Sequence, residues 1–174
     1  MTDDTRHQDR MQRNPHLSGF TGMSPADGEA GEASCGAFGY LRGLRDSSAA
    51  VELRFRDGNS MWFPYAWLGN WQYNPSEGLL LKFSDDLVYL VLIEGSNLDR
   101  PLSEGAINLT HAGLQRHRVH WIREMTREEI RQGGEKGPTI DSIEVGLFGS
   151  HDTLKEWVAK KAPTFLKLTA AFTA

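Results

Sequence analysis

The sequence lacks the residues and segments that several classes of protein require. Cys35 is the only cysteine among 174 residues, which excludes an intrachain disulfide and a zinc site built from several cysteines. No run approaches the roughly 18 apolar residues of a membrane-spanning helix, and residues 1–13 are polar where a secretory signal needs an apolar stretch. We therefore expect a protein of the reducing cytoplasm that is not inserted in a membrane.

An excess of positive charge is also absent. The formal net charge is −4, and none of the segments 1–50, 51–125 and 126–174 has a net positive charge. Because Lys and Arg that neutralise phosphates supply most of the affinity for nucleic acid, this balance argues against a nucleic-acid-binding protein without excluding a small local patch. The glycines at 36, 39 and 43 do not form a phosphate loop, since no strand is predicted before them and no Gly-Lys-Ser/Thr ending follows.

The first part of the chain has little apolar periodicity. Residues 1–48 are rich in Gly, Asp, Glu, Ser and Arg, a composition typical of segments that cannot bury enough apolar surface to fold. We therefore predict a disordered or flexible N-terminal arm over residues 1–48. Residues 36–44 contain enough apolar side chains to contact a folded core, although their glycines argue against a stable helix or strand.

The predicted core begins with a β-hairpin. Apolar and charged residues alternate over 51–56, and Asp57-Gly58 supplies the turn. The second strand of the hairpin should end near Phe63, because Pro64 cannot donate a backbone hydrogen bond to a neighbouring strand.

Further strands are predicted at 79–83, 87–93 and 117–123, with an irregular crossover over 98–114. The run at 87–93 is almost continuously apolar and suits a strand that is buried on both faces. About five strands in so short a segment predict a small, strongly bent antiparallel sheet or a partly open barrel.

The C-terminal extension is predicted to contain three short elements. Thr126 and Glu129 have the spacing of a capping box at the start of a short helix, and residues 143–148 are a candidate edge strand. Asp152 is the predicted N-cap of a helix over 152–162 that packs on the sheet. The fold class is thus mainly β with minor α. The predicted arm, core domain and extension comprise residues 1–48, 49–125 and 126–174.

Residues 57–68 read Asp-Gly, four residues, Phe-Pro, two residues, Trp-Leu. This pattern resembles the small β-rich domain found at the N-terminus of the γ-butyrobetaine hydroxylase family and in stand-alone bacterial proteins. In that family cysteines follow the Trp-Leu and, with a later histidine, resemble a structural zinc site. Here residues 69–72 are Gly-Asn-Trp-Gln, which cannot ligate zinc, and the oxygenase domain is absent. The resemblance therefore implies a fold, and we expect neither a metal nor another cofactor.

Aromatic residues are concentrated in one segment of the predicted core. They are Trp62, Phe63, Tyr65, Trp67, Trp71 and Tyr73. Most should fill the core, because each ring buries roughly 150 Å² or more. Alternation also sends some rings outward, where an exposed Trp or Tyr among polar groups can anchor a partner. We predict that Trp62 and Tyr65 point outward and that they form a partner-binding surface with Arg54 and Arg56.

Three histidines are candidate metal ligands. If 117–123 is a strand, His117 and His120 point to opposite faces, so at most one of them could share a site with His111. The sequence therefore favours surface histidines paired with carboxylates over a metal site.

Three functions remain open. The leading hypothesis is a non-enzymatic interaction module that binds a protein partner through an aromatic face or a sheet edge. The second is a small nucleic-acid-binding β-barrel whose arginines converge if the first and last strands are neighbours. These arginines are Arg54, Arg56, Arg116, Arg118 and Arg123. The third is a small enzyme that uses His117 or His120 in a concave pocket with an oriented carboxylate.

Overall fold

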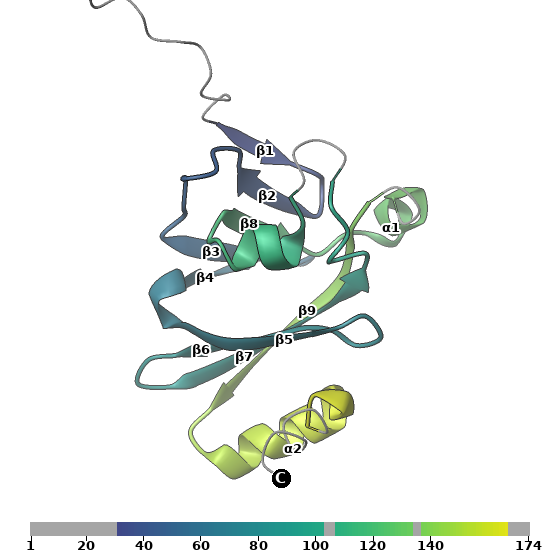
Figure 1. Cartoon of the computed structure of the whole chain (residues 1–174). Coiled ribbons are helices and arrows are strands. Elements are labelled where there is room, and N and C mark those ends of the chain that lie inside the picture. The colour runs from purple at the N-terminus through teal and green to yellow at the C-terminus, as the bar shows by residue number, and fades with distance from the viewer. Residues whose placement is uncertain (1–30, 103–106, 134–136, 167–174) are drawn as a thin grey trace, which may run out of the picture.

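The structure, a computed structural model, describes residues 31–102, 107–133 and 137–166. Its strands form two sheets that pack face to face without closing into a barrel, and a C-terminal helix covers the outer side of one sheet (Figure 1). This confirms the predicted fold class, mainly β with minor α. The described residues form two sheets of five and four strands, however, where the sequence predicted about five strands in one sheet.

The first sheet, sheet A, is assembled from three separate parts of the chain. In spatial order its strands are β1 (Glu32–Ser34), β2 (Phe38–Leu41), β8 (Val119–Arg123), β3 (Ala50–Arg54) and β4 (Ser60–Pro64). Neighbouring strands are antiparallel except β3 and β8, which are parallel. The late strand β8 therefore joins two hairpins from the N-terminal part of the chain.

The second sheet, sheet B, is antiparallel throughout. In spatial order its strands are β5 (Leu68–Asn74), β6 (Gly78–Ser84), β7 (Val88–Ser96) and β9 (Thr139–Phe148). The predicted edge strand at 143–148 is confirmed, and it is longer because it begins at Thr139.

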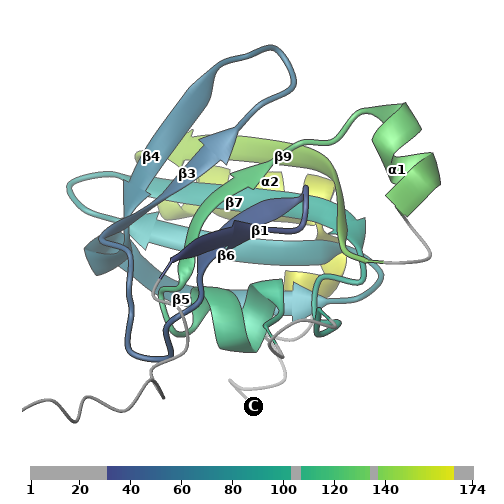
Figure 2. The same ribbon diagram turned by 90° about the horizontal axis from the view of Figure 1, so that it is seen from above.

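The chain passes from one sheet to the other at three places, after β4, after β7 and after β8. The 3-10 helix η1 (Tyr65–Trp67) connects β4 to β5, and α1 (Arg127–Gly133) lies between β8 and β9. Seen from above, the strands of sheet A run across those of sheet B, and the β3–β4 hairpin extends past β9 (Figure 2). The tip of this hairpin therefore projects beyond sheet B and does not lie over it.

Aromatic packing holds the two sheets together. The Phe63 ring stacks on that of Phe83, with centroids 4.6 Å apart, and meets the edge of the Tyr89 ring at 5.4 Å. All three residues belong to the cluster between the sheets. Offset and edge-on ring pairs of this kind add to the burial of apolar area. The prediction that the aromatic segment mainly fills the core is thus confirmed for Phe63.

The segment between β7 and β8 closes one end of this core. A π-helix, η2 (Leu109–Leu114), occupies part of the predicted irregular crossover, and its N-cap Asn108 accepts a hydrogen bond from the Ala112 N–H at 2.9 Å. The fully buried apolar side chains of this segment are Leu98, Ile107, Leu109 and Leu114. The crossover is therefore more regular than predicted, because these four spaced apolar residues turn to the core.

Strand β7 is buried on both faces, as predicted. Val91 and Ile93 belong to the core between the sheets, whereas Leu90 and Leu92 contact the second apolar cluster beneath α2 (His151–Lys161). The helix predicted at 152–162 is thereby confirmed and packs on sheet B.

The N-cap of α2 differs from the prediction. It is Ser150, whose hydroxyl accepts a hydrogen bond from the Thr153 N–H at 3.4 Å. Asp152 lies instead in the first turn, where a negative charge is favoured by the helix dipole.

The prediction of a flexible arm over 1–48 is wrong for its described part. Residues 1–30 lie outside the described residues. The rest of the predicted arm contains β1 and β2, and its Ala37 and Phe38 are fully buried. Sequence periodicity missed β2 because Gly39 interrupts it. The space beside Gly39 is filled by the side chain of Trp121 from β8.

β4 ends at Pro64, one residue after the predicted end near Phe63, and Pro64 pairs with Ala50. β4 is an edge strand, so one row of its backbone groups has no neighbour. The Tyr65 N–H donates to the Ala49 carbonyl at 2.9 Å, which places the nitrogen of Pro64 on the open side by the alternation of an antiparallel ladder. The proline therefore costs no hydrogen bond.

The strand predicted at 117–123 begins two residues later. His117 has a φ of 54°, a left-handed conformation that belongs to the turn before β8. Its ring stacks on that of Tyr65 at a centroid distance of 4.4 Å.

Within the described ranges, no helix combines the length and apolar character needed to cross a bilayer.

Arg118 provides a stability test because its side chain is only 4 % exposed and donates to two backbone carbonyls, those of Leu41 at 2.9 Å and Arg42 at 2.8 Å. In Arg118→Met the apolar stem is kept and both bonds are lost, so the free energy of unfolding should fall by about 2–3 kcal/mol. The exposed Arg116, changed to Met, removes the same charge and should stay within about 0.5 kcal/mol of the parent. Urea denaturation measures both, and similar small losses would contradict the assigned bonds.

Candidate functional site

A row of paired residues crosses the outer face of sheet A, the side turned away from sheet B. The register places Trp62 opposite Glu52, Glu52 opposite Trp121, and Trp121 opposite Gly39. Paired residues in adjacent strands project to the same side of a sheet. We define the outer face of sheet A by Gly39, Glu52, Arg54, Trp62 and Trp121.

Trp62 is the most exposed member of this face. Its exposed fraction is 64 %, although the neighbouring Phe63 is buried in the core. The predicted outward orientation of Trp62 is therefore confirmed. Because it lies on a strand and not on a loop, its position is set by the backbone of β4.

A buried charge lies beside Trp62. Glu52 is only 9 % exposed and is flanked by Trp62 and Trp121 in the row. Both Nε and a terminal nitrogen of Arg54 lie 2.7 Å from the same Glu52 carboxylate oxygen. This charge-assisted contact compensates the desolvation of the carboxylate.

Arg54 also lies over an aromatic ring. Its guanidinium carbon is 4.7 Å from the centroid of the Trp121 ring, within the range of a cation–π interaction. The guanidinium is thus held between a carboxylate and an indole, so it does not present an unbalanced charge to the solvent.

Gly39 is required by the position of Trp121. A Cβ atom at residue 39 would lie 2.2 Å from the indole Nε1 of Trp121. The indole therefore covers the backbone of β2 at the place where a side chain is missing. This contact explains how a glycine is accommodated inside a strand.

His120 lies at the end of this face, next to Trp121. It is the additional residue of a bulge between β2 and β8, and its ring meets the Trp121 ring edge-on at 6.2 Å. Its Nε2 lies 3.6 Å from a Glu32 carboxylate oxygen, while its buried Nδ1 has no hydrogen-bond partner among the described residues. The predicted pairing of a histidine with a carboxylate is thus seen at His120.

The prediction that Tyr65 points outward is wrong. Its side chain is 4 % exposed, and its hydroxyl donates to the Val119 carbonyl at 2.8 Å. Tyr65 lies two residues after the buried Phe63, and its N–H still donates to the carbonyl of Ala49, just before β3, so the alternation of β4 itself turns Tyr65 to the core. Burial raises the pKa of the Tyr65 hydroxyl above its ordinary value, because the phenolate would lose its solvation.

Arg56 lies apart from the outer face, at the end of β3. Its guanidinium donates to the backbone carbonyls of Met125 at 2.9 Å and Asp141 at 2.7 Å, which ties the β3–β4 hairpin to β9. With neighbouring residues of α1 and β9 it lines an open hollow of about 700 Å³. The lining residues are Arg56, Arg127, Ile130, Arg131 and Asp141.

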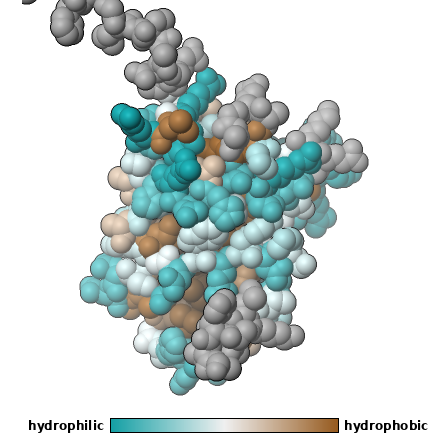
Figure 3. All heavy atoms as spheres, in the orientation of Figure 1, coloured by the Kyte–Doolittle hydropathy of each residue, from teal (hydrophilic) through white to brown (hydrophobic). Residues whose placement is uncertain are grey.

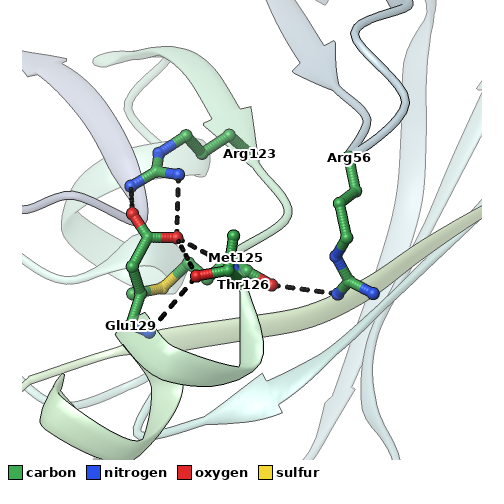
Figure 4. A network of polar contacts seen from close by, with 5 residues as sticks. All are labelled: Arg56, Arg123, Met125, Thr126 and Glu129. Atoms are coloured by element: carbon green, nitrogen blue, oxygen red, sulfur yellow. Dashed lines mark hydrogen bonds and ion pairs between the residues drawn. The ribbon is translucent and has the colours of Figure 1, made fainter.

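Beside Arg56, the start of α1 is fixed by the predicted capping box (Figure 4). The Thr126 N–H donates to the Glu129 carboxylate at 2.8 Å, and the Glu129 N–H donates to the Thr126 hydroxyl at 3.3 Å. Arg123 adds a hydrogen bond of 2.7 Å to the same carboxylate. These contacts, that from Arg123 above all, lower the pKa of Glu129 to about 2.

The arginines proposed for nucleic-acid binding do not form one free basic surface. β3 and β8 are neighbours, as that hypothesis required, and Arg54 pairs in register with Arg123. Each of the two is bound to a carboxylate, however, and Arg118 is buried. These arginines therefore interact mainly with carboxylates and carbonyl groups of the chain itself.

The three histidines have separate surroundings. His111 lies beside Trp71, with ring centroids 6.1 Å apart, whereas His117 stacks on Tyr65 and His120 faces Glu32. In the part of the chain that the structure describes, no three His, Cys, Asp or Glu side chains form a cluster that could hold a metal.

Hydrophobic residues form small separate areas between hydrophilic ones on the surface seen in Figure 3. The exposed large hydrophobic side chains of the described residues are Leu44, Met61, Trp62, Leu87 and Leu147. Two of these, Met61 and Trp62, are consecutive in β4. β4, one of the two edge strands of sheet A, thus combines apolar exposure with a free row of backbone groups.

The sequence pointed to Trp62 and Arg54 but missed the remaining members of the outer face. From the sequence alone, Glu52 was one of several charged residues expected on the solvent side of an alternating strand. Trp121 was one aromatic residue of the last predicted strand. Their proximity depends on the parallel register of β3 with β8, which has no local signal in the sequence.

The contact between Gly39 and Trp121 can be tested by a double-mutant cycle. Gly39→Ala should displace the indole and lower the free energy of unfolding by about 1–3 kcal/mol, the usual cost of overpacking. In a Trp121→Ala background the same change should cost less than about 0.5 kcal/mol, because the obstructing ring is gone. Denaturation of the four proteins measures the coupling, and additive losses would contradict the contact.

Tyr65 makes stability depend on pH in the alkaline range. The folded state favours the protonated hydroxyl, so this contribution is complete below about pH 10 and is lost as the pH rises toward the elevated pKa. Tyr65→Phe should be about 1 kcal/mol less stable at pH 7 because the Val119 carbonyl loses its donor. That deficit should shrink between about pH 10 and 11 in urea titrations. If the stability difference between Tyr65→Phe and the parent stayed constant over this pH range, the raised pKa of Tyr65 would be contradicted.

Comparison with known proteins assigns the chain to no family. No protein-family model matches the sequence, and no curated protein or solved structure is significantly similar to it. What the outer face of sheet A binds is therefore inferred from its own geometry and chemistry.

Proposed function

We propose that this protein is a non-enzymatic interaction module that binds a protein partner through the outer face of sheet A. The observation that carries the proposal is the 64 % exposure of Trp62 on a strand, beside a buried and internally paired carboxylate. A large rigid ring that is left in water at a fixed position is the usual anchor of a protein interface.

The surroundings of Trp62 support an anchor more than a chance exposure. Backbone pairing of β4 with β3 fixes the Cα of residue 62, so a partner would not have to order a loop in order to bind the ring. Glu52 and Arg54 beside it already satisfy one another and form a polar rim. A partner that covers Trp62 therefore gains apolar burial without separating an ion pair.

The chemistry of the face also indicates the kind of partner. The two charges nearest Trp62 neutralise each other, so the face offers an aromatic surface and a paired rim. We infer an uncharged, apolar contact on the partner and a weak dependence of affinity on salt. Because the single Cys35 forms no disulfide within the chain, we place this interaction in the reducing cytoplasm.

Nucleic-acid binding is the second candidate. Arg54 on β3 and Arg123 on β8 pair in register, and Arg56 lies in the turn after β3. The weakness of this candidate is that two of the three guanidinium groups are bound to carboxylates. This alternative requires an affinity that falls steeply with salt concentration.

An enzyme that uses His117 or His120 is the third candidate. His120 has a carboxylate beside it in Glu32, but that carboxylate is largely exposed and the hollow near α1 is lined by neither histidine. A reaction at His120 would require a pocket that encloses the substrate. The geometry therefore favours binding over catalysis.

The resemblance of residues 57–68 to the β-rich domain of the γ-butyrobetaine hydroxylase family stays a proposal about fold. These residues form the β3–β4 turn, β4 and η1. They include Trp62, but the resemblance carries no activity to this chain.

Comparative capture tests the proposed function. Tagged full-length protein, Trp62→Ala and the matched control Leu44→Ala would be cross-linked and purified from the native host. Leu44 is also an exposed apolar side chain, but it lies in the loop between β2 and β3. A partner bound through the outer face should be lost at least about tenfold with Trp62→Ala, the effect of removing a hot-spot residue, and retained with Leu44→Ala. Equal recovery with all three proteins would refute the proposal.

A further inference from the structure

The open edge of β4 has a defined pattern of free backbone groups. At one end of the hairpin the Phe55 N–H donates to the Asn59 carbonyl at 2.9 Å, and at the other the Tyr65 N–H donates to the Ala49 carbonyl at 2.9 Å. Antiparallel bonds alternate between these ends. Met61 and Phe63 therefore bond toward β3, and the backbone groups of Ser60, Trp62 and Pro64 point away from the sheet.

This edge lacks the usual protection against strand pairing. Ser60 to Pro64 contains no charged residue, and only its last position is a proline. Natural edge strands are commonly blocked by charges, bulges or covering segments. The other edge strand of sheet A, β1, contains Glu32, and the edge strand β9 of sheet B contains Asp141 and Glu144. The edge strand β5 has an irregularity between Leu68 and Trp71. Among the described edges, β4 thus combines an uncharged sequence with regular pairing.

Both faces of β4 expose apolar side chains. Trp62 projects from the outer face, and Met61, on the opposite side, is 36 % exposed. A strand added to this edge would find an apolar neighbour above and below.

We propose that the open edge of β4 pairs with the β4 strand of a second copy of this chain, antiparallel and with Trp62 opposite Trp62. This inference goes beyond the proposed function, because the backbone edge carries it and not the outer face alone. In this register the two Trp62 residues exchange two N–H···O bonds on the two-fold axis. The Ser60 N–H of each copy also reaches the Pro64 carbonyl of the other.

Charge and shape favour a second copy as the occupant. The β4 strand is itself an uncharged, apolar and extended segment of the kind this edge accepts. The nearest charges, Glu52 and Arg54, are paired within each copy, so like charges do not oppose each other across the axis. Pro64 removes one donor at each end, and five residues of strand bury less than the roughly 1,200 Å² typical of a stable interface. The dimer should therefore be weak and reversible.

Site-specific cross-linking tests the register. In a Cys35→Ser background, Trp62→Cys places two thiols at a hydrogen-bonded pair, where Cα atoms about 5.5 Å apart suit a disulfide. The matched control Ser60→Cys lies on the same strand face, but the two residues 60 would be about 14 Å apart along the strands, beyond disulfide reach. In a glutathione buffer, Trp62→Cys should form covalent dimer at least about tenfold faster than Ser60→Cys.

Sedimentation of the full chain provides the second measurement. The unmodified protein should shift from monomer to dimer as its concentration rises into the range from about 0.1 to 1 mM, and Trp62→Lys should stay monomeric because a lysine blocks an edge. Equal cross-linking of the two cysteine variants, or a monomer throughout this range, would overturn the pairing. Either result would leave the proposed function standing, since that is judged by capture of a different protein with Trp62→Ala and Leu44→Ala.

Discussion

The parallel pairing of β3 with β8 is the constraint on which the rest of sheet A depends. It brings Glu52 beside Trp121 and places the arm-derived strand β2 on the far side of β8. Without it, Arg54 would lack its aromatic neighbour and Gly39 would lack the indole that covers it. The outer face of sheet A is thus a product of topology more than of any single segment.

The two sheets differ in how their faces are covered. Sheet B packs on one side against the core between the sheets and on the other against α2. Sheet A covers that core on one side only, and its other side is free to contact a partner. A rigid, doubly covered sheet thereby supports a sheet with one open face, and residues on that face keep fixed positions.

Much of the fold was predictable because its signals are local. The alternation in β3, the apolar run of β7 and the capping box of Thr126 and Glu129 each lie within a few residues, and all were confirmed. Trp62 was found for the same reason. Tyr65 was misplaced because the prediction ended the strand near Phe63, whereas the alternation continues through Pro64 and turns Tyr65 to the same side as Phe63. β2 was missed because Gly39 is explained only by Trp121, 82 positions further along the chain.

The position of β8 in the chain has a consequence for folding. The central strand of sheet A, β8, is synthesised after all the other strands of that sheet. More than 60 residues separate it from β2 and β3, the two strands between which it pairs. Contacts between residues so far apart in sequence close slowly, because the chain between them must first lose its freedom. We expect the meander β5-β6-β7 to assemble first from local contacts, and sheet A to complete last.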